Sequence, residues 1–303
     1  MWVRFPPPAH MECIYGPLAK ELPDGFAPPE MWPEFPATAR PVGICRRELV
    51  GTHPRGVRWS LWPLTFEEYV GDDAPDFKAS DKGNLAYNRL VMWRRITPVA
   101  PPPSWRAWAK GPWRLDGFYT LVPGADYTRD WQHNARRDLK QWHEHFADKG
   151  YIIETISFDE FKKTYQKNVS VKKAGLELFY ILERTYRDPS THQHLQLLGV
   201  RNTRSGAVVA GTAVLYSPTH YSSMRYCPFM LPEGRLVYAS TALIDHWYRD
   251  AQKKNSTTLF FTSFWHQGLP KSWKGFSAFK SHFGLQYVFY PPTLYRFVGG
   301  KFF

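Results

Sequence analysis

The sequence predicts an α/β protein in which helices flank a mixed central sheet. Two observations lead to this fold class. Strand and helix patterns recur over residues 116–303, and several of the strands follow one another directly instead of alternating with helices. A doubly wound parallel sheet requires strict alternation, so we expect parallel and antiparallel neighbours within one sheet. No internal repeat of solenoid length is visible.

Residues 1–115 differ in character from the rest of the chain. They hold most of the 26 prolines, including the runs at 6–8 and 101–103. Because proline fixes φ and lacks an N–H group, this stretch cannot be mostly helical. We therefore expect a short, proline-rich domain over 1–115, with strands near 57–62 and 90–96, followed by a complete domain over 116–303.

The elements of the second domain follow from residue period and from cap and turn residues. Gly150 ends one helix, Ser157 and Glu160 have the spacing of a capping box that opens another, and Pro189 stops a third. Residues 202–206, Asn-Thr-Arg-Ser-Gly, are typical of a hairpin loop. The expected elements are strands at 117–122, 151–156, 194–201, 208–216, 221–226, 259–262, 287–290 and 294–298, and helices at 127–149, from 157 onward, at 174–187, 237–254 and 276–283.

The composition excludes several classes of protein. Hydrophobic residues make up 43% and aromatic residues 17%, which is enough apolar material for a folded core. No apolar run reaches the roughly 18 residues of a membrane span, and the first residues lack the apolar segment of a signal peptide. Cys13, Cys45 and Cys227 form no C-x-x-C pair and suit a reducing compartment. We expect a cytoplasmic protein without integral membrane association.

An excess of positive charge favours an anionic partner. Lys and Arg number 39 against 27 Asp and Glu, for a net charge of +12. No acidic residue follows Asp250, whereas seven Lys and Arg residues there are interleaved with aromatic side chains. Bases can stack on aromatic rings while lysines offset phosphates, so this stretch suits unpaired RNA. A core strand and helix whose lysines lie on the solvent-exposed side would give the same pattern.

Other charged motifs have a second explanation. Arg136 and Lys140 lie one turn apart on a predicted helix and could clamp a phosphate or carboxylate, or simply form a solvated face. Two His-x-His sequences, at 143–145 and 192–194, lack the further ligands of a tetrahedral site, so we expect no metal. The phosphate-binding loops of NTPases and dehydrogenases and the G-x-S-x-G elbow are absent.

Two segments resemble a known family. Residues 273–284, Trp-Lys-Gly-Phe-Ser-Ala-Phe-Lys-Ser-His-Phe-Gly, resemble the G-x-x-x-F-K-x-x-F-G segment near the end of Fem-type peptidoglycan-bridge aminoacyltransferases, which share the acetyltransferase (GNAT) fold. Residues 136–140, Arg-Arg-Asp-Leu-Lys, resemble the family's R-x-x-[IL]-[RK] on the first helix of its second GNAT domain. The resemblance covers 116–303 and implies a GNAT-like sheet there, with 1–115 as a degenerate, partial first GNAT-like domain.

The resemblance also implies an activity. An aminoacyl group would pass from aminoacyl-tRNA to an amine of a peptidoglycan precursor and form an amide, without a bound cofactor. The protein would be cytoplasmic, with peripheral contact at the inner membrane face. Lys280, with the backbone of Phe279, would lie beside the donor ester and stabilise developing negative charge. The residues expected to contact the acceptor are Arg136, Arg137, Lys140, Arg225 and Tyr226. Those expected to contact the donor RNA are Arg235, Lys271, Trp273 and Lys274.

The sequence does not decide which residue is the general base or which molecule donates the acyl group. Asp116, Asp126 and Glu233 could each accept the proton of the acceptor amine, and each could equally be a cap or turn residue. A CoA-dependent N-acetyltransferase acting on a polysaccharide or small amine is one alternative. Its R/Q-x-x-G-x-G/A loop would start at Arg235 and lack both glycines, which favours the tRNA donor. A non-catalytic RNA-binding protein on an acyltransferase scaffold is the other.

Overall fold

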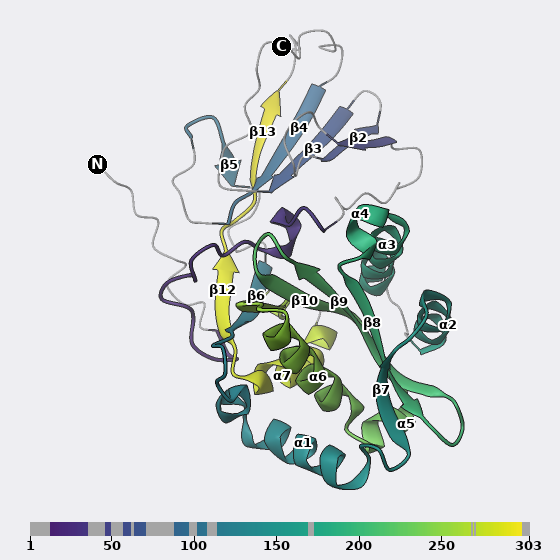
Figure 1. Cartoon of the computed structure of the whole chain (residues 1–303). Helices are drawn as coiled ribbons and strands as arrows, with labels where there is room; N and C mark the ends of the chain where they lie inside the picture. The colour runs from purple at the N-terminus through teal and green to yellow at the C-terminus, as the bar shows by residue number, and fades with distance from the viewer. Residues whose placement is uncertain are drawn as a thin grey trace.

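The computed structural model describes residues 13–35, 46–49, 57–61, 64–70, 88–96, 102–107, 114–168, 173–267, 269 and 271–298. The proline run at 6–8 and Cys45 lie outside these residues. Two sheets dominate the described part of the chain (Figure 1). The larger sheet has seven strands, in the order β12 (Gln286–Tyr290), β6 (Arg114–Thr120), β11 (Thr258–Phe261), β10 (Ser222–Met230), β9 (Val208–Ser217), β8 (Leu195–Asn202) and β7 (Tyr151–Thr155).

The larger sheet is mixed, as the sequence predicts. Among its described strands, β10 and β11 run parallel and every other neighbouring pair runs antiparallel. The expected hairpin between β8 and β9 is confirmed, since the Gly206 N–H donates to the Asn202 carbonyl at 2.9 Å. The capping box is also present in part: the Ser157 hydroxyl accepts a hydrogen bond of 3.2 Å from the Glu160 N–H.

The smaller sheet joins segments that are far apart in the sequence. Its six strands are ordered β1 (Arg46–Leu49), β2 (Val57–Leu61), β3 (Leu64–Val70), β4 (Asn88–Arg94), β13 (Leu294–Val298) and β5 (Arg106–Ala107). The last strand, β13, pairs antiparallel with β4 along its whole length. The smaller sheet thus contains one strand from after position 115, and its other strands all come before that position. The division of the chain into two domains at position 115 stays a prediction.

Helices cover the larger sheet on both faces (Figure 1). On one face lie α1 (His133–His145) and α6 (Ala239–Lys253), with α7 (Lys274–Lys280) and the short 3-10 helix η5 (Ser281–Phe283). The opposite core contains α2 (Phe158–Asn168), α3 (Lys173–Arg187) and the N-terminal segment that carries η1 (Pro29–Met31). The remaining short helices are η3 (Tyr127–Asp130), α4 (Pro189–His192), α5 (Pro232–Leu236) and η4 (Lys271–Trp273).

Two predicted helices differ from the structure: one is interrupted, and the other begins two residues later than expected. The helix expected over 127–149 begins as η3, which Asp126 caps by accepting the Thr128 N–H, and resumes as α1 after the extended backbone of Trp131. This extended residue places the Trp131 ring in the core. The helix expected over 237–254 begins at Ala239, because Tyr238 has a left-handed backbone with φ of 57°.

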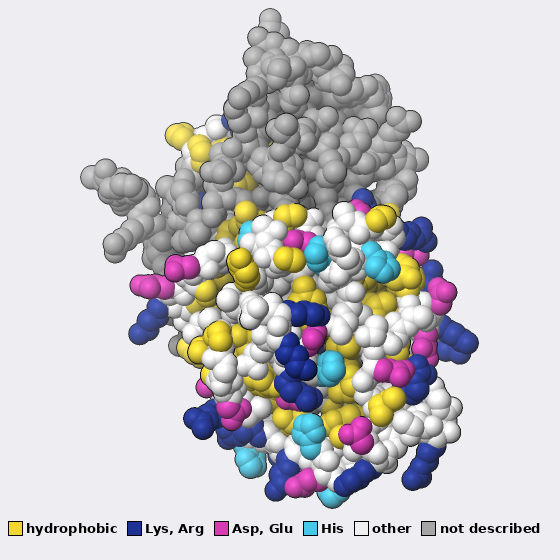
Figure 2. Space-filling view, viewed as in Figure 1, with side chains coloured by type: hydrophobic (Ala, Val, Ile, Leu, Met, Phe, Trp, Pro, Cys, Tyr) yellow, Lys and Arg dark blue, Asp and Glu magenta, His cyan; other side chains and the backbone are white. Residues whose placement is uncertain are grey.

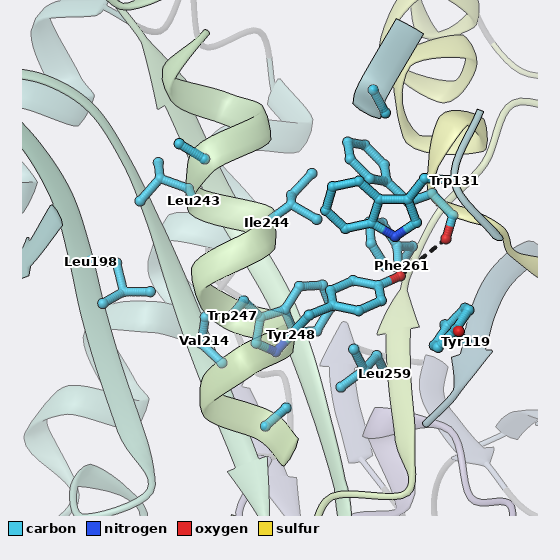
Figure 3. Packing of buried hydrophobic residues seen from close by; sticks show 14 of the residues in the cluster. Tyr119, Trp131, Leu198, Val214, Leu243, Ile244, Trp247, Tyr248, Leu259 and Phe261 are labelled. Atoms are coloured by element: carbon cyan, nitrogen blue, oxygen red, sulfur yellow. Dashed lines mark hydrogen bonds between the residues drawn. The ribbon is translucent and has the colours of Figure 1, made fainter. Parts of the chain in front are cut away.

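The core between α6 and the sheet is rich in aromatic side chains. Trp247 and Tyr248 on α6 are fully buried, together with Trp131 and Phe261 beside them (Figure 3). Their polar atoms have partners: the Trp247 Nε1–H donates to the Ser223 hydroxyl at 2.9 Å, and the Tyr248 hydroxyl donates to the Phe283 carbonyl at 3.1 Å. The hydrogen bond from Tyr248 ties η5 to α6 and so fixes the end of α7.

We expect Leu243→Ala to lower the free energy of unfolding by about 2–5 kcal/mol, because Leu243 is fully buried between α6 and the sheet and its truncation leaves a cavity. Urea denaturation followed by tryptophan fluorescence measures the change. Leu236→Ala on α5 is the matched control, since Leu236 is 75% exposed and its loss should change stability by less than about 0.5 kcal/mol. Equal effects of the two substitutions would contradict this packing.

Candidate functional site

The candidate site lies where the parallel strands β10 and β11 part. The two strands pair over three positions, from Ser222 opposite Thr258 to Met224 opposite Phe260. Beyond Met224, β10 continues to pair with β9, with a register shift after Tyr226 where Cys227 has a φ of 47°. Because β11 ends at Phe261, the residues of β10 after Met224 have no β11 residue paired beside them, and we call this place the gap between β10 and β11.

Arg225 stands on β10 at the start of this gap. Its side chain is 8% exposed, and its Nε is buried without a hydrogen-bond acceptor. Among the described residues its guanidinium makes no ion pair and no hydrogen bond, so burial lowers its pKa to about 10. A buried cation that lacks a counter-charge costs stability. Such a residue is expected where a ligand supplies the missing negative charge.

Lys280, the last residue of α7, brings a second cation to the same gap. Its Nζ donates a 2.6 Å hydrogen bond to the Thr262 carbonyl, just after β11. The rings of Phe276 and Phe264 enclose the amine, with centroids 4.6 and 5.2 Å from Nζ. Burial, and then the positive charge of Arg225, lower the pKa of Lys280 to about 7, while Asp116 acts in the opposite direction. The amine therefore changes charge near neutral pH.

A buried carboxylate lies beside these cations. Asp116 on β6 is fully buried, and it accepts a 2.7 Å hydrogen bond from the Ser263 N–H and pairs with Arg114 at 2.8 Å. Arg114 also forms a two-point ion pair with Glu30 of η1. Burial raises the pKa of Asp116, and the charge of Arg114 offsets part of that effect. Burial would also raise the pKa of Glu30, but Arg114 more than reverses this and holds it below its usual value.

Some of the residues predicted from the sequence come together here. Lys280 and Arg225 lie close enough for their charges to interact, and Phe279 packs on Phe283 with ring centroids 5.3 Å apart. Tyr226 lies elsewhere, because alternation along β10 turns it to the opposite face, where it is buried in the core with α2 and α3. The neighbouring positions Arg225 and Tyr226 therefore do not share one site.

The basic residues of α1 are exposed next to this region. The Arg136 guanidinium donates to the Arg129 carbonyl at 3.1 Å, and Arg137 and Lys140 pair with acidic neighbours on their own helix. The Gln132 N–H, one turn before Arg136, donates to the His282 carbonyl, so the start of α1 is joined to η5. On the face shown in Figure 2, several Lys and Arg side chains lie together near the centre, with acidic and histidine side chains beside them.

The residues assigned to RNA divide into two groups. Lys274 lies over the Trp265 ring with Nζ 4.2 Å from its centroid, and the Trp273 ring is 5.5 Å from that of Phe276. Phe276 is 39% exposed, so an aromatic surface with the exposed Lys271 beside it adjoins Lys280. Arg235 is separate from this group: α5 is held at the β7 and β8 side of the sheet (Figure 1).

The three candidate bases have different environments. Asp126 is exposed and caps η3. Glu233 accepts hydrogen bonds from Tyr151 at 2.8 Å and from Asn202 at 2.6 Å, and so anchors α5. Asp116 is the one of the three that adjoins Lys280.

Sequence reasoning did not single out Glu30 and Arg114. They are 84 residues apart, and Glu30 follows a pair of prolines in a stretch without a regular pattern. No local signal in the sequence connects them. The buried position of Asp116 likewise depends on the sheet and not on its neighbours in the chain. Among the described residues, no helix is long and apolar enough to cross a membrane.

Comparison with known proteins identifies the fold. No protein-family model and no curated protein match this sequence. The solved structure of FemX is similar, with a TM-score of 0.58 and 11% identity over 84% of this chain and 88% of that chain. The structure of L-PGS from Bacillus licheniformis is also similar, with a TM-score of 0.50 and 12% identity over 84% of each chain. The chain shares the fold of these two structures. The predicted α/β class, with a mixed sheet flanked by helices, is confirmed.

We expect Arg225→Met to raise the free energy of unfolding of the ligand-free protein by about 1–4 kcal/mol, because it replaces an unpaired buried charge with an apolar side chain of similar length. Arg201→Met is the control, since Arg201 pairs with Glu160 at 2.8 Å and also with Glu154; its loss should destabilise by about 1–3 kcal/mol. Urea denaturation of both variants measures the difference. Destabilisation by Arg225→Met would mean that Arg225 has a structural partner.

Proposed function

We propose that this protein is an acyltransferase of the Fem type, which transfers an aminoacyl group from aminoacyl-tRNA to an amine of a peptidoglycan precursor and forms an amide. The observation that carries the proposal is the pair of cations, Arg225 and Lys280, at the gap between β10 and β11. The resemblance of residues 273–284 to the Fem-type segment supports the same assignment of Lys280. The Fem-like GNAT fold supports acyl transfer as the class of reaction.

The chemistry that fits this pair is attack on an ester carbonyl. The acceptor amine attacks the carbonyl carbon of the aminoacyl ester, and negative charge develops on the carbonyl oxygen. The Lys280 ammonium and the Arg225 guanidinium would offset that charge in a site of low dielectric constant, where such stabilisation is large. The bond to the terminal ribose oxygen then breaks. The ribose leaves as its hydroxyl with the proton that the amine gives up, and the amide remains.

The surface beside Lys280 supports an RNA donor. Trp273 and Phe276 offer partly exposed rings on which an unpaired base can stack, and Lys271 and Lys274 can contact phosphates. A base stacked on Phe276 would bring the attached ester within reach of the Lys280 amine, since this ring lies 4.6 Å from Nζ.

The junction between α5 and α6 favours this donor over acetyl-CoA. A GNAT pyrophosphate loop needs glycines so that backbone N–H groups can approach the phosphates. Here residues 232–236 form α5, and Tyr238, with its left-handed backbone, precedes α6 where the first of these glycines would stand. Tight binding of acetyl-CoA in calorimetry would contradict the proposal.

We expect Lys280→Met to reduce kcat for aminoacyl transfer by about 10²–10³-fold, because it removes one cation that stabilises the transition state. Transfer of a radiolabelled aminoacyl group from charged tRNA to a stem-peptide precursor measures it. Lys163→Met, on the exposed side of α2, is the control and should leave kcat unchanged. Full activity of Lys280→Met would remove Lys280 from the mechanism.

The kcat of the wild-type protein should fall as pH rises through about 7. Below the pKa of Lys280 the amine is charged and can stabilise the oxyanion; above it the amine is neutral and cannot. Lys280→Met should lack this fall. A kcat that instead rises over the same range would indicate that neutral Lys280 acts as a base.

Binding of tRNA should weaken steeply with salt, because Lys271 and Lys274 release counterions from phosphates. Each single Lys→Met substitution at these positions should reduce the slope of log K against log salt by about 1, whereas Lys163→Met should not change it. Filter binding with aminoacylated and stripped tRNA gives the slopes. Equal binding of both forms, with no transfer, would favour the non-catalytic RNA-binding alternative.

A further inference from the structure

A line of alternating charges runs from the N-terminal segment to the candidate site. Glu30 pairs with Arg114, Arg114 pairs with Asp116 at 2.8 Å, and Asp116 lies within electrostatic range of Lys280. The Tyr290 ring covers Arg114, with its centroid 4.6 Å from the guanidinium carbon. The groups come from η1, β6 and α7, so the fold, and not the local sequence, brings them together.

The charges of these groups partly offset one another. Glu30 and Asp116 both pair with Arg114, and the charge of Arg94 also acts on Glu30. The negative charge of Asp116 acts on Lys280, whereas the positive charge of Arg225 opposes it. Arg225 itself has no ion pair or hydrogen bond among the described residues.

Asp116 and Lys280 also hold the same piece of backbone. Asp116 accepts the Ser263 N–H at 2.7 Å, and Lys280 donates to the carbonyl of the preceding residue, Thr262, at 2.6 Å. Ser263 has a left-handed backbone with φ of 62°, which is uncommon for a residue other than glycine and needs support from its surroundings. The hydrogen bond from Ser263 to Asp116 supplies that support, so Asp116 fixes the carbonyl that orients the Lys280 amine.

We infer that Asp116 is a positioning residue, which favours the charged form of the Lys280 amine and fixes the backbone that orients it, and that Arg114 and Glu30 hold Asp116 in place. The catalytic benefit of this role rests on the proposed function. Without Asp116, Lys280 would face the like charge of Arg225 in a buried setting, and the neutral amine would be favoured. Asp116 is thus assigned the role of a fixed counter-charge and not that of a general base.

Direct titration of Lys280 tests this inference without any substrate. The protein is labelled with ¹³C at lysine Cε, and the Lys280 signal is the one that Lys280→Met removes. Asp116→Asn keeps the acceptor for the Ser263 N–H but removes the charge, so the pKa of Lys280 should fall by about one unit or more. Arg225→Gln removes the opposing charge and should move the same pKa upward. Because the two shifts have opposite signs, a general loosening of the structure cannot produce both.

Glu30→Gln provides a second variant in case Asp116→Asn does not fold. It removes one of the two carboxylates that offset Arg114, so the pKa of Lys280 should fall, though by less than in Asp116→Asn. Glu154→Gln is the matched control, because Glu154 pairs with Arg201 on the β7 and β8 side of the sheet and should cause no shift. A Lys280 pKa that stays constant or rises in both Asp116→Asn and Glu30→Gln would overturn the inference.

Activity gives an independent readout of the same role. In Asp116→Asn the fall of kcat with rising pH should begin at lower pH, displaced by the shift of the Lys280 pKa, whereas kcat at the acidic end should approach that of the wild type. A uniform loss of kcat at every pH would indicate a merely structural role and contradict the inference. If the pKa shifts appear but the wild-type protein transfers no aminoacyl group, the charge coupling stands and the proposed function fails.

Discussion

The burial of one positive charge, that of Arg225, is the constraint on which the site depends. Moving a charged side chain out of water costs considerable free energy, and no described residue offsets this cost by an ion pair or hydrogen bond with Arg225. The rest of the fold must therefore supply stability in excess. The aromatic core around Trp247 and Tyr248 does so, because large fully buried rings contribute several kcal/mol each through burial and packing.

The end of the pairing between β10 and β11 determines what lies beside the buried Arg225. If β11 continued alongside β10, its backbone would pair with β10 beside Arg225. Instead β11 ends at Phe261, and the following backbone is held between Asp116 and Lys280. The backbone that leaves the β10–β11 pairing is thus the same backbone that Asp116 and Lys280 hold, within range of the charge of Arg225.

Sequence patterns predicted the parts of this structure that are local. The strands and helices follow residue period, and the Phe-Lys pair at 279–280 belongs to a recognisable segment. The interruption at Trp131 was not predicted, because it depends on the burial of this ring in the tertiary core. The left-handed backbone of Tyr238, which delays the start of α6, was not predicted either. Glu30 and Arg114 were missed for a similar reason: their pairing is set by how the N-terminal segment crosses β6. The opposite directions of Arg225 and Tyr226 follow from strand alternation, which the predicted strand already implied.

The pairing of β13 with β4 has a consequence for how the protein is made. The two strands are separated by roughly 200 residues, so β4 leaves the ribosome long before its partner. At ordinary rates of synthesis this interval is about 10–40 s. During that time the edge of β4 that β13 later covers has no strand beside it from this pairing, and such an edge can associate with other chains. The smaller sheet can therefore be completed only after β13 has been synthesised, and the edge of β4 that β13 covers lacks this partner until then.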